Sequence, residues 1–332
     1  MSKLQLSIYQ FVLKEKGKSE GSEYPKLGDF YRENFIREED KLSDVTREKV
    51  YHNFIEDFID LFNDEFQLNK NETKGIGLDY IRPYPSSYII DGILKGGPTG
   101  IEQEIFDKED METPEGVLAE DKLTTLPYYF KLWSPYDNQS GILMIQSYTD
   151  YGVNTLILSH IKEVFRKYNT SFITERFIPK ILKEEYINDS QVYKIAFLKN
   201  SLPREARERF NPVFTDYEGL KVKIEITGFN DDPENFLNNL FKPEHKIGAN
   251  LSDLGIGNEE EYETVVYYKD EFGHRTHAKA EKQIEIRPTI YLSDSLKMED
   301  KDFADYEKVR AHTDGILETI KVEIGYKPID NG

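Results

Sequence analysis

The chain has 332 residues, of which 38% are hydrophobic and 32% charged, and its formal net charge is −19 at pH 7. This length suffices for one large domain or two of ordinary size, and 22 Tyr and 20 Phe supply bulky core material that disordered chains lack. The absence of cysteine excludes disulfides, thiolate zinc sites, iron–sulfur clusters and a cysteine nucleophile. The acidic balance disfavours a protein that coats nucleic acid nonspecifically.

The N-terminus has no uninterrupted apolar segment of the kind found in secretory signals. The longest apolar runs are also too short to cross a bilayer. The sequence therefore predicts a cytoplasmic protein with no membrane contact. Most of its negative charge falls in residues 51–150, which hold 7 Lys or Arg against 19 Asp or Glu.

The first third of the chain predicts one strand and one long helix. Residues 3–13 alternate apolar and polar side chains with the period of a half-buried strand, whereas the charged, glycine-bearing residues 14–30 are typical of a solvated loop. Residues 45–66 carry apolar side chains three or four positions apart and predict an amphipathic helix that lies on a sheet. Its apolar stripe consists of Val50, Phe54, Ile55, Phe58, Ile59, Phe62 and Phe66. Glycines and prolines in residues 70–85 predict a turn and an irregular approach to the next strand.

A central sheet is predicted over residues 87–149. Its strands are expected at 87–95, 101–108, 126–133 and 142–149, with a glycine-rich reversal at 96–100. The reversal lacks the Lys-Ser/Thr of a phosphate-binding loop and precedes a strand, which indicates a plain turn. The third strand has aromatic side chains on both faces, so we expect it to be covered on each side, with Trp133 buried. An amphipathic helix is predicted at 152–168, and His160 at the border of its apolar face indicates a core or boundary histidine.

The second half mixes strands with short helices. Strands are expected at 191–198, 220–227, 263–269 and 277–292, and helices at 174–186, 203–210, 232–240 and 302–321. The last helix is expected to dock on the sheet of this half. The predicted fold class is α+β with two lobes, each a mostly antiparallel or mixed sheet covered by amphipathic helices. A composition shift near residue 170 places the boundary between an N-terminal lobe, 1–170, and a C-terminal lobe, 171–332.

Two groups of acidic residues are candidates for a divalent metal site. Glu102 and Glu104 face the same way on a predicted strand and, with Asp107, could hold Mg²⁺ through oxygen ligands. No EF-hand spacing accompanies them, which favours a solvated acidic loop with no cofactor. Glu285 lies near the spacing of a metal-dependent nuclease motif, but Arg287 stands where such a site needs a base.

Two basic islands interrupt the acidic chain. Residues 194–209 hold five basic and two acidic side chains, and residues 274–287 hold four basic and two acidic ones. If both islands face the same way, they form a positive patch that could contact the phosphates of DNA or RNA. The alternative is an ordinary salt-bridged surface. The candidate nucleic-acid-binding residues are Lys194, Lys199, Arg204, Arg207, Arg209, Arg275, Lys279 and Lys282.

The acidic window, residues 51–150, predicts a negative face on the N-terminal lobe. Tyr136, Tyr148 and Tyr151 beside it belong to a residue type enriched where proteins meet, so this face is a candidate docking surface for a protein partner. The alternative is a solvated acidic surface without a partner.

In composition the chain resembles the Lys/Ile/Asn/Tyr-rich accessory proteins of bacterial mobile elements and antiviral defence loci. It contains no Gly-x-Ser-x-Gly element or other catalytic motif. The sequence therefore predicts a non-catalytic interaction or regulatory subunit of a bacterial antiviral defence system. Such a subunit would bind another protein, encoded nearby, and contact nucleic acid through the C-terminal lobe. The alternative is a divalent-metal-dependent nuclease or another hydrolase.

Overall fold

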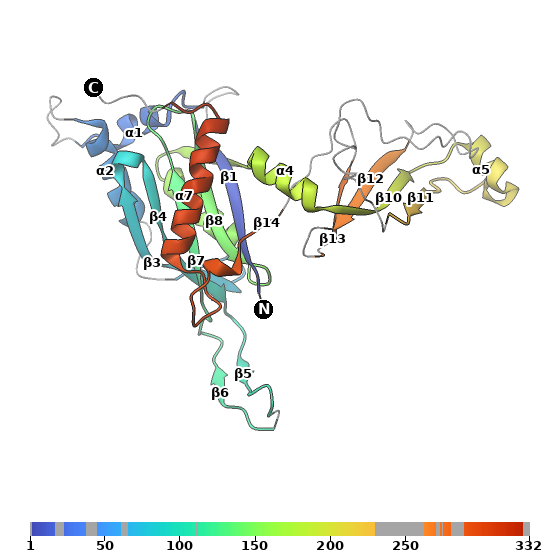
Figure 1. Cartoon of the computed structure of the whole chain (residues 1–332), viewed down its shortest axis with the longest axis horizontal. Helices are drawn as coiled ribbons and strands as arrows, with labels where there is room; N and C mark the ends of the chain where they lie inside the picture. Colours follow the sequence, from blue (N-terminus) through green and yellow to red (C-terminus); the bar gives the residue numbers. More distant parts are fainter. Residues whose placement is uncertain are drawn as a thin grey trace. The chain divides into compact units, whose positions relative to one another are not determined.

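The computed structural model describes residues 2–16, 23–37, 45–60, 66–110, 112–229, 262–269, 273, 275–279 and 289–327. The fold is α+β, as predicted, and its described sheets pair antiparallel (Figure 1). The chain divides into two compact units, one of Met1–Phe177 with Thr289–Gly332 and one of Ile178–Pro288. This division differs from the predicted boundary near residue 170, because the chain beyond that point first completes the sheet of the first unit.

The first unit is built on an eight-stranded sheet with the order β14-β1-β8-β7-β4-β3-β2, in which β9 also pairs with β1. Its strands are β1 (Leu4–Glu15), β2 (Gln67–Leu68), β3 (Lys74–Tyr84), β4 (Ile89–Pro98), β7 (Leu126–Trp133), β8 (Ser140–Tyr148), β9 (Thr170–Arg176) and β14 (Ile290–Tyr291). The register of β14 places Ile290 opposite Leu6, so the two ends of the chain share one sheet.

Helices α1 (Leu27–Phe35), α2 (Arg47–Asp60) and α3 (Asn154–Arg166) pack together on one face of this sheet. Their common core is aromatic, because the Phe165 ring lies 5.6 Å from Phe30 and 6.0 Å from Phe54, measured between ring centroids. The Tyr31 hydroxyl donates a hydrogen bond of 3.2 Å to the Ser134 carbonyl, which ties α1 to the end of β7.

Helix α7 (Tyr306–Glu323) lies across the opposite face of the same sheet (Figure 1). Successive side chains of a strand point to opposite faces, and the odd-numbered residues of β7 meet this helix. The Tyr129 ring lies 5.6 Å from Tyr306, and Trp133 is 1% exposed, which confirms that it is buried. The expectation that the last helix docks on the sheet of the second half was therefore wrong. Amphipathicity shows which face of a helix is buried but not which sheet covers it.

Two further local expectations were wrong. Residues 27–30 were expected in a loop but begin α1, whose Leu27, Phe30, Tyr31 and Phe35 are buried at helical spacing. Residues 74–84 were expected to be irregular but form β3. Pro83 is tolerated there because β2 pairs only with the other end of β3, so at Pro83 the strand lies at the edge of the described sheet.

The predicted 101–108 strand does not join the central sheet. Its core, β5 (Gln103–Ile105), pairs only with β6 (Gly116–Leu118) in a separate two-stranded ribbon. In the preceding glycine-rich segment, Gly97 allows close packing of the backbone, because a Cβ at this position would lie 2.0 Å from the Thr124 carbonyl oxygen. This packing explains the glycine without a bound anion. Phe66, expected in the helix stripe, lies outside α2 and is 48% exposed, whereas Phe62 lies outside the described residues.

The second unit contains a four-stranded sheet with the order β11-β10-β12-β13. Its elements are α4 (Lys180–Asp189), β10 (Gln191–Lys199), α5 (Arg204–Phe210), β11 (Val222–Thr227), β12 (Glu263–Lys269) and β13 (Arg275–Lys279). Among the described residues of both units, short 3₁₀ helices occur at Pro85–Ser87, Pro212–Phe214 and Asp294–Leu296. The start of the predicted helix 174–186 is instead the end of β9, and the predicted helix 232–240 lies outside the described residues.

Candidate nucleic-acid interface

The strand register of the second unit decides which basic residues share a face. Lys194 of β10 lies opposite Tyr267 of β12, and Tyr267 lies opposite His277 of β13. Residues two apart on a strand point to the same face, so Arg275 and Lys279 join His277. Lys194 of the first basic island thus shares one face of this sheet with Arg275 and Lys279 of the second island, and we call this face the basic sheet face.

Aromatic rings alternate with cations across the basic sheet face. The Lys194 ammonium lies 4.2 Å from the centre of the Tyr267 ring, and the centres of Tyr267 and His277 are 5.5 Å apart. Tyr193 occupies a bulge in β10, where the register shifts between Val192 and Lys194. The Arg275 guanidinium lies 5.3 Å from the centre of the Tyr193 ring. Three rings and two cations therefore form a continuous row over three strands.

The strands of the basic sheet face carry a positive net charge. By the register, its cations are Lys194, Lys223, Lys269, Arg275 and Lys279, and its carboxylates are Glu225 and Glu263. Five positive and two negative charges give +3, against −19 for the whole chain. The carboxylates are ion-paired: Lys194 and Lys223 donate to Glu225 at 2.8 and 2.7 Å, and both bonds lower its pKa. Lys279 pairs with Glu263.

The other predicted nucleic-acid-binding residues do not belong to this row. Lys199 points to the opposite side of β10 from Lys194, and its ammonium lies 5.3 Å from the Tyr262 ring centre. Arg204, Arg207 and Arg209 lie on α5, where Arg207 donates to the Tyr217 carbonyl. Lys282 lies outside the described residues.

The acidic residues proposed for Mg²⁺ are spread along an exposed ribbon. Glu104 lies on β5, Glu102 precedes it, and the Asp107 carboxylate accepts the Glu109 backbone N–H at 2.8 Å, as in a solvated turn. In the part of the chain that the structure describes, no three His, Asp or Glu side chains gather closely enough to hold a metal ion. Glu285 and Arg287 lie outside those residues.

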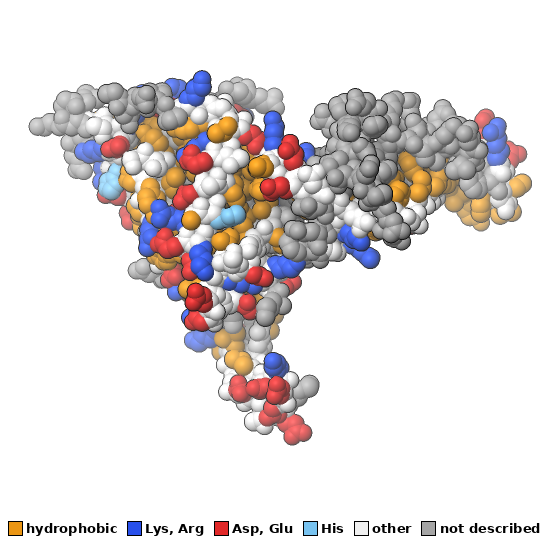
Figure 2. Space-filling view, viewed as in Figure 1, with side chains coloured by type: hydrophobic (Ala, Val, Ile, Leu, Met, Phe, Trp, Pro, Cys, Tyr) orange, Lys and Arg blue, Asp and Glu red, His pale blue; other side chains and the backbone are white. Residues whose placement is uncertain are grey.

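The β5–β6 ribbon extends from the first unit with acidic side chains around its tip (Figures 1 and 2). Residues 101–121, which we call the acidic arm, hold nine Asp or Glu and one Lys, a net charge of −8. Apolar side chains are nevertheless exposed on it, with Ile101 at 64% and Val117 at 58%. Charge and exposed apolar area thus occur together on one projecting element.

Three other side chains with possible chemistry lie in the core. His160 is buried on α3 beside Ile161 and Val164, as predicted for a core histidine. Burial, assisted by the positive charge of Lys167, lowers the pKa of His160 to about 4. The imidazole is therefore neutral at pH 7. Asp91 and Lys131 are buried beneath α7, where both contact side chains of that helix.

The sequence reasoning missed the aromatic part of the basic sheet face. In the sequence, Tyr193 directly precedes Lys194, and Tyr267 lies two positions before Lys269. This proximity of aromatic and basic residues was a local signal for such a face. That signal became specific only through the pairing of β10 with β12, because pairing decides which tyrosines face the same side as the lysines.

No protein-family model, curated protein or solved structure matches this chain. Among the described helices, none combines the length and apolar character that crossing a membrane requires. The geometry of the two units is therefore the basis for assigning a function.

Proposed function

We propose that this chain is a binding protein that holds single-stranded nucleic acid on the basic sheet face of its second unit. The observation that carries this proposal is the row of Tyr193, Tyr267 and His277 interleaved with Lys194 and Arg275. Bases stack on aromatic side chains, while neighbouring cations contact the phosphates. A sheet face that presents both groups in one row supplies both contacts.

A single strand fits this face better than a duplex. The faces of bases are available for stacking only when they are not paired within a helix, and a ring row offers little to a duplex backbone. The charge of +3 corresponds to about three phosphates, so we expect log K to fall with log salt at a slope of about −2. A strongly basic duplex-binding surface would have a steeper slope.

The test is fluorescence anisotropy with a labelled oligothymidine and a labelled oligouridine. Tyr267→Ala should weaken binding by about tenfold, because stacking contributes roughly 1–3 kcal/mol per base. Tyr217→Ala, a change at an exposed tyrosine outside the sheet, serves as the matched control and should bind like the wild type. Equal affinity of the two variants, or no binding at low salt, would contradict the proposal.

The same titration addresses the alternative of a divalent-metal nuclease. The oligonucleotide is incubated with the protein in Mg²⁺ or Mn²⁺ and its length is followed by electrophoresis. Our proposal expects binding with the strand intact. Cleavage that needs the metal would favour the hydrolase.

We further propose that the acidic arm binds a protein partner with a basic surface. The arm combines a charge of −8 with exposed Ile101, Ile105 and Val117, so a basic partner gains both electrostatic attraction and apolar burial. A two-stranded ribbon has marginal stability alone, which favours an element that is supported by a partner. The compositional resemblance to accessory proteins of antiviral defence loci supports a subunit of such an assembly, with the partner encoded nearby.

The partner is sought by pairwise co-expression with proteins encoded by neighbouring genes. For a complex that forms, Asp110→Lys with Glu112→Lys should slow association at low salt, and Ile105→Ser with Val117→Ser should speed dissociation. Glu299→Lys with Asp300→Lys makes the same charge change at exposed positions outside the arm. If the arm and control variants associate equally fast, the arm is not the docking surface.

A further inference from the structure

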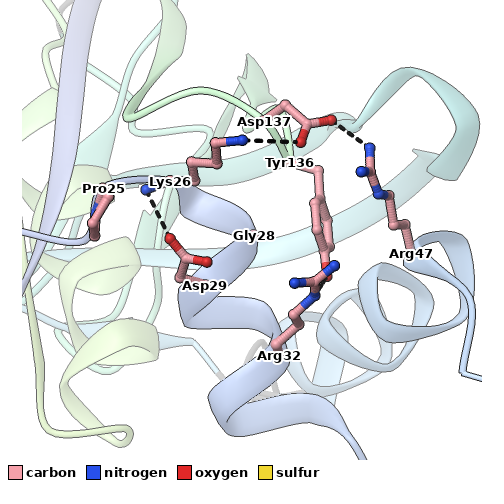
Figure 3. Close-up of a pocket in the computed structure, with 8 residues that line it drawn as sticks. All are labelled: Pro25, Lys26, Gly28, Asp29, Arg32, Arg47, Tyr136 and Asp137. Carbon is pink, nitrogen blue, oxygen red and sulfur yellow. Dashed lines mark hydrogen bonds and ion pairs between the residues drawn. The ribbon is translucent and has the colours of Figure 1, made fainter. Parts of the chain in front are cut away.

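A cavity of about 280 Å³ lies in the first unit where the starts of α1 and α2 meet the turn after β7 (Figure 3). Its lining residues are Pro25, Lys26, Gly28, Asp29, Arg32, Arg47, Tyr136 and Asp137. Three cations and two carboxylates give the lining a net charge of +1, although the chain carries −19. The cavity is thus a local positive site in an acidic protein.

Both carboxylates in the cavity already have partners. Asp137 accepts a hydrogen bond of 2.5 Å from Arg47 Nη1, and its other oxygen lies 3.7 Å from the Lys26 ammonium. Asp29 accepts the backbone N–H of Lys26 at 3.1 Å. These contacts leave Arg32 as the cation that no carboxylate of the lining neutralises (Figure 3).

Arg32 has more N–H donors than it has hydrogen bonds to described residues. Among the described residues, its one hydrogen bond runs from Nε to the Tyr136 hydroxyl, at 2.8 Å. A guanidinium has five N–H donors in a planar fork, so four remain on its two terminal nitrogens. The Tyr136 hydroxyl accepts the Arg32 bond and therefore keeps its own proton for another acceptor.

One wall of the cavity is a buried tyrosine ring with two cations beside it. The Tyr136 ring is buried, and the Arg32 and Arg47 guanidiniums lie 5.5 and 5.4 Å from its centre. Burial raises the pKa of Tyr136, which keeps its hydroxyl protonated at neutral pH. Arg47 is the first residue of α2. A positive charge at a helix N-terminus is disfavoured by the helix dipole, so helix stability does not explain an arginine at this position.

The start of α1 does not itself supply the anion donors. The backbone N–H of Leu27 bonds to the Asn138 carbonyl and that of Gly28 to the Tyr136 carbonyl, both at 2.8 Å. The recognition groups are therefore the side chains of Arg32, Arg47, Lys26 and Tyr136. Planar guanidiniums bind the oxygens of phosphate through paired hydrogen bonds, and Lys adds a point charge.

We propose that this cavity binds a phosphate group, with the Arg32 fork and the Tyr136 hydroxyl as donors and Arg47 and Lys26 as flanking charges. The volume is slightly below the roughly 300–1,000 Å³ of sites that enclose a drug-sized ligand, so the phosphate is either free or carried on a small molecule. This site lies in the first unit and is independent of the basic sheet face of the second.

The test is calorimetric titration of the whole chain with inorganic phosphate and with adenosine monophosphate, at constant ionic strength. Arg32→Gln should weaken phosphate binding by about tenfold or more, because it removes the charged fork. Arg82→Gln is the matched control, since Arg82 forms an exposed ion pair with Glu307 in the same unit. Tyr136→Phe, which removes only the hydroxyl, serves as a second variant and should weaken binding to a smaller extent.

The outcomes separate the two sources of the phosphate. Tighter binding of the monophosphate indicates an organic phosphate, whereas equal or tighter binding of inorganic phosphate indicates the free ion. Absence of heat with both ligands would overturn the proposal. So would equal affinity of the Arg32→Gln and Arg82→Gln variants, which would show that Arg32 only ties α1 to Tyr136.

Discussion

Asp91 of β4 and Lys131 of β7 lie directly opposite each other in the sheet, and both are 1% exposed beneath α7. Asp91 accepts hydrogen bonds from the hydroxyls of Tyr306, at 2.6 Å, and Tyr129, at 3.2 Å. Lys131 donates to Asp314 of α7 at 2.5 Å. Burial raises the pKa of Asp91 and lowers that of Lys131, while each charge opposes the shift of the other. This pair anchors the last helix to the sheet through polar contacts.

Replacing Lys131 alone should be strongly destabilising. Lys131→Met removes the buried positive charge that faces the Asp91 carboxylate, which leaves Arg310, 3.7 Å away, as its remaining cation. Breaking a buried charge pair costs about 3–5 kcal/mol. We expect about 3 kcal/mol, since Tyr306 and Tyr129 still donate to Asp91. Urea unfolding measures the loss, and Lys122→Met, which breaks an exposed ion pair with Asp121, should change stability by less than about 0.5 kcal/mol.

The same pair should show coupling in a double-mutant cycle. Adding Asp91→Asn to Lys131→Met removes the buried negative charge that Lys131 faced, so the double variant should be more stable than the two single losses predict. We expect an interaction energy of at least about 1 kcal/mol. Strict additivity in urea unfolding would mean that Asp91 and Lys131 act independently, despite facing each other.

His160 should make the protein sensitive to acid. Its pKa is about 4 when folded and 6.5 in the unfolded reference, so the unfolded state binds the proton first as pH falls. Its stabilising contribution is complete above pH 6.5 and is lost progressively down to pH 4, by about 2 kcal/mol between pH 7 and 5. His160→Leu should flatten the pH dependence of unfolding. Parallel pH profiles for the wild type and His160→Leu would contradict this role.

Gly28 should be irreplaceable at the junction of α1 with the turn after β7. A Cβ at this position would lie 2.4 Å from Tyr136 Cδ1 and 2.5 Å from its carbonyl oxygen. Gly28→Ala should therefore destabilise the protein by about 1–3 kcal/mol. Gly315→Ala, in the middle of α7 with no atom within 4 Å of its Cβ, should stabilise it by about 0.5–1 kcal/mol. Thermal unfolding of both variants checks the opposite signs.

Trp133 should report on the first unit alone. Its ring is buried, and the Tyr326 ring after α7 packs edge-on against it at 4.9 Å. Because this is the single tryptophan of the chain, the native emission should be blue-shifted and poorly quenched by iodide. Emission like that of free tryptophan in the native protein would show that α7 does not cover this part of the sheet.

The sequence by itself determined the elements whose side chains alternate or recur with a clear period. The strand at 126–133 was predicted with the bounds of β7, because aromatic residues on both of its faces require cover on both sides. The helix predicted at 152–168 corresponds to α3, and its apolar face is buried as expected. These properties depend on local spacing, which a sequence displays directly.

Local spacing was insufficient where another part of the chain supplies the partner. Helix α1 follows charged, glycine-bearing residues, and its buried Phe30 and Tyr31 gain their environment from α2, α3 and the turn after β7. The last helix shows an apolar face, but the residues that hold it, Asp91 and Lys131, lie about two hundred positions earlier. Neither contact can be inferred from a window of neighbouring residues.

The candidate sites divide in the same way. The sequence identified the charge of Lys194, Arg275 and Lys279, but only the pairing of β10, β12 and β13 placed them on one face with Tyr267. It gave no indication that Arg32 and Arg47, from two helices, converge on Tyr136. Charge and periodicity are properties of single segments, whereas a binding site is a juxtaposition of segments. Strand register and helix docking decide that juxtaposition, because burial of the apolar faces selects one arrangement of the whole chain.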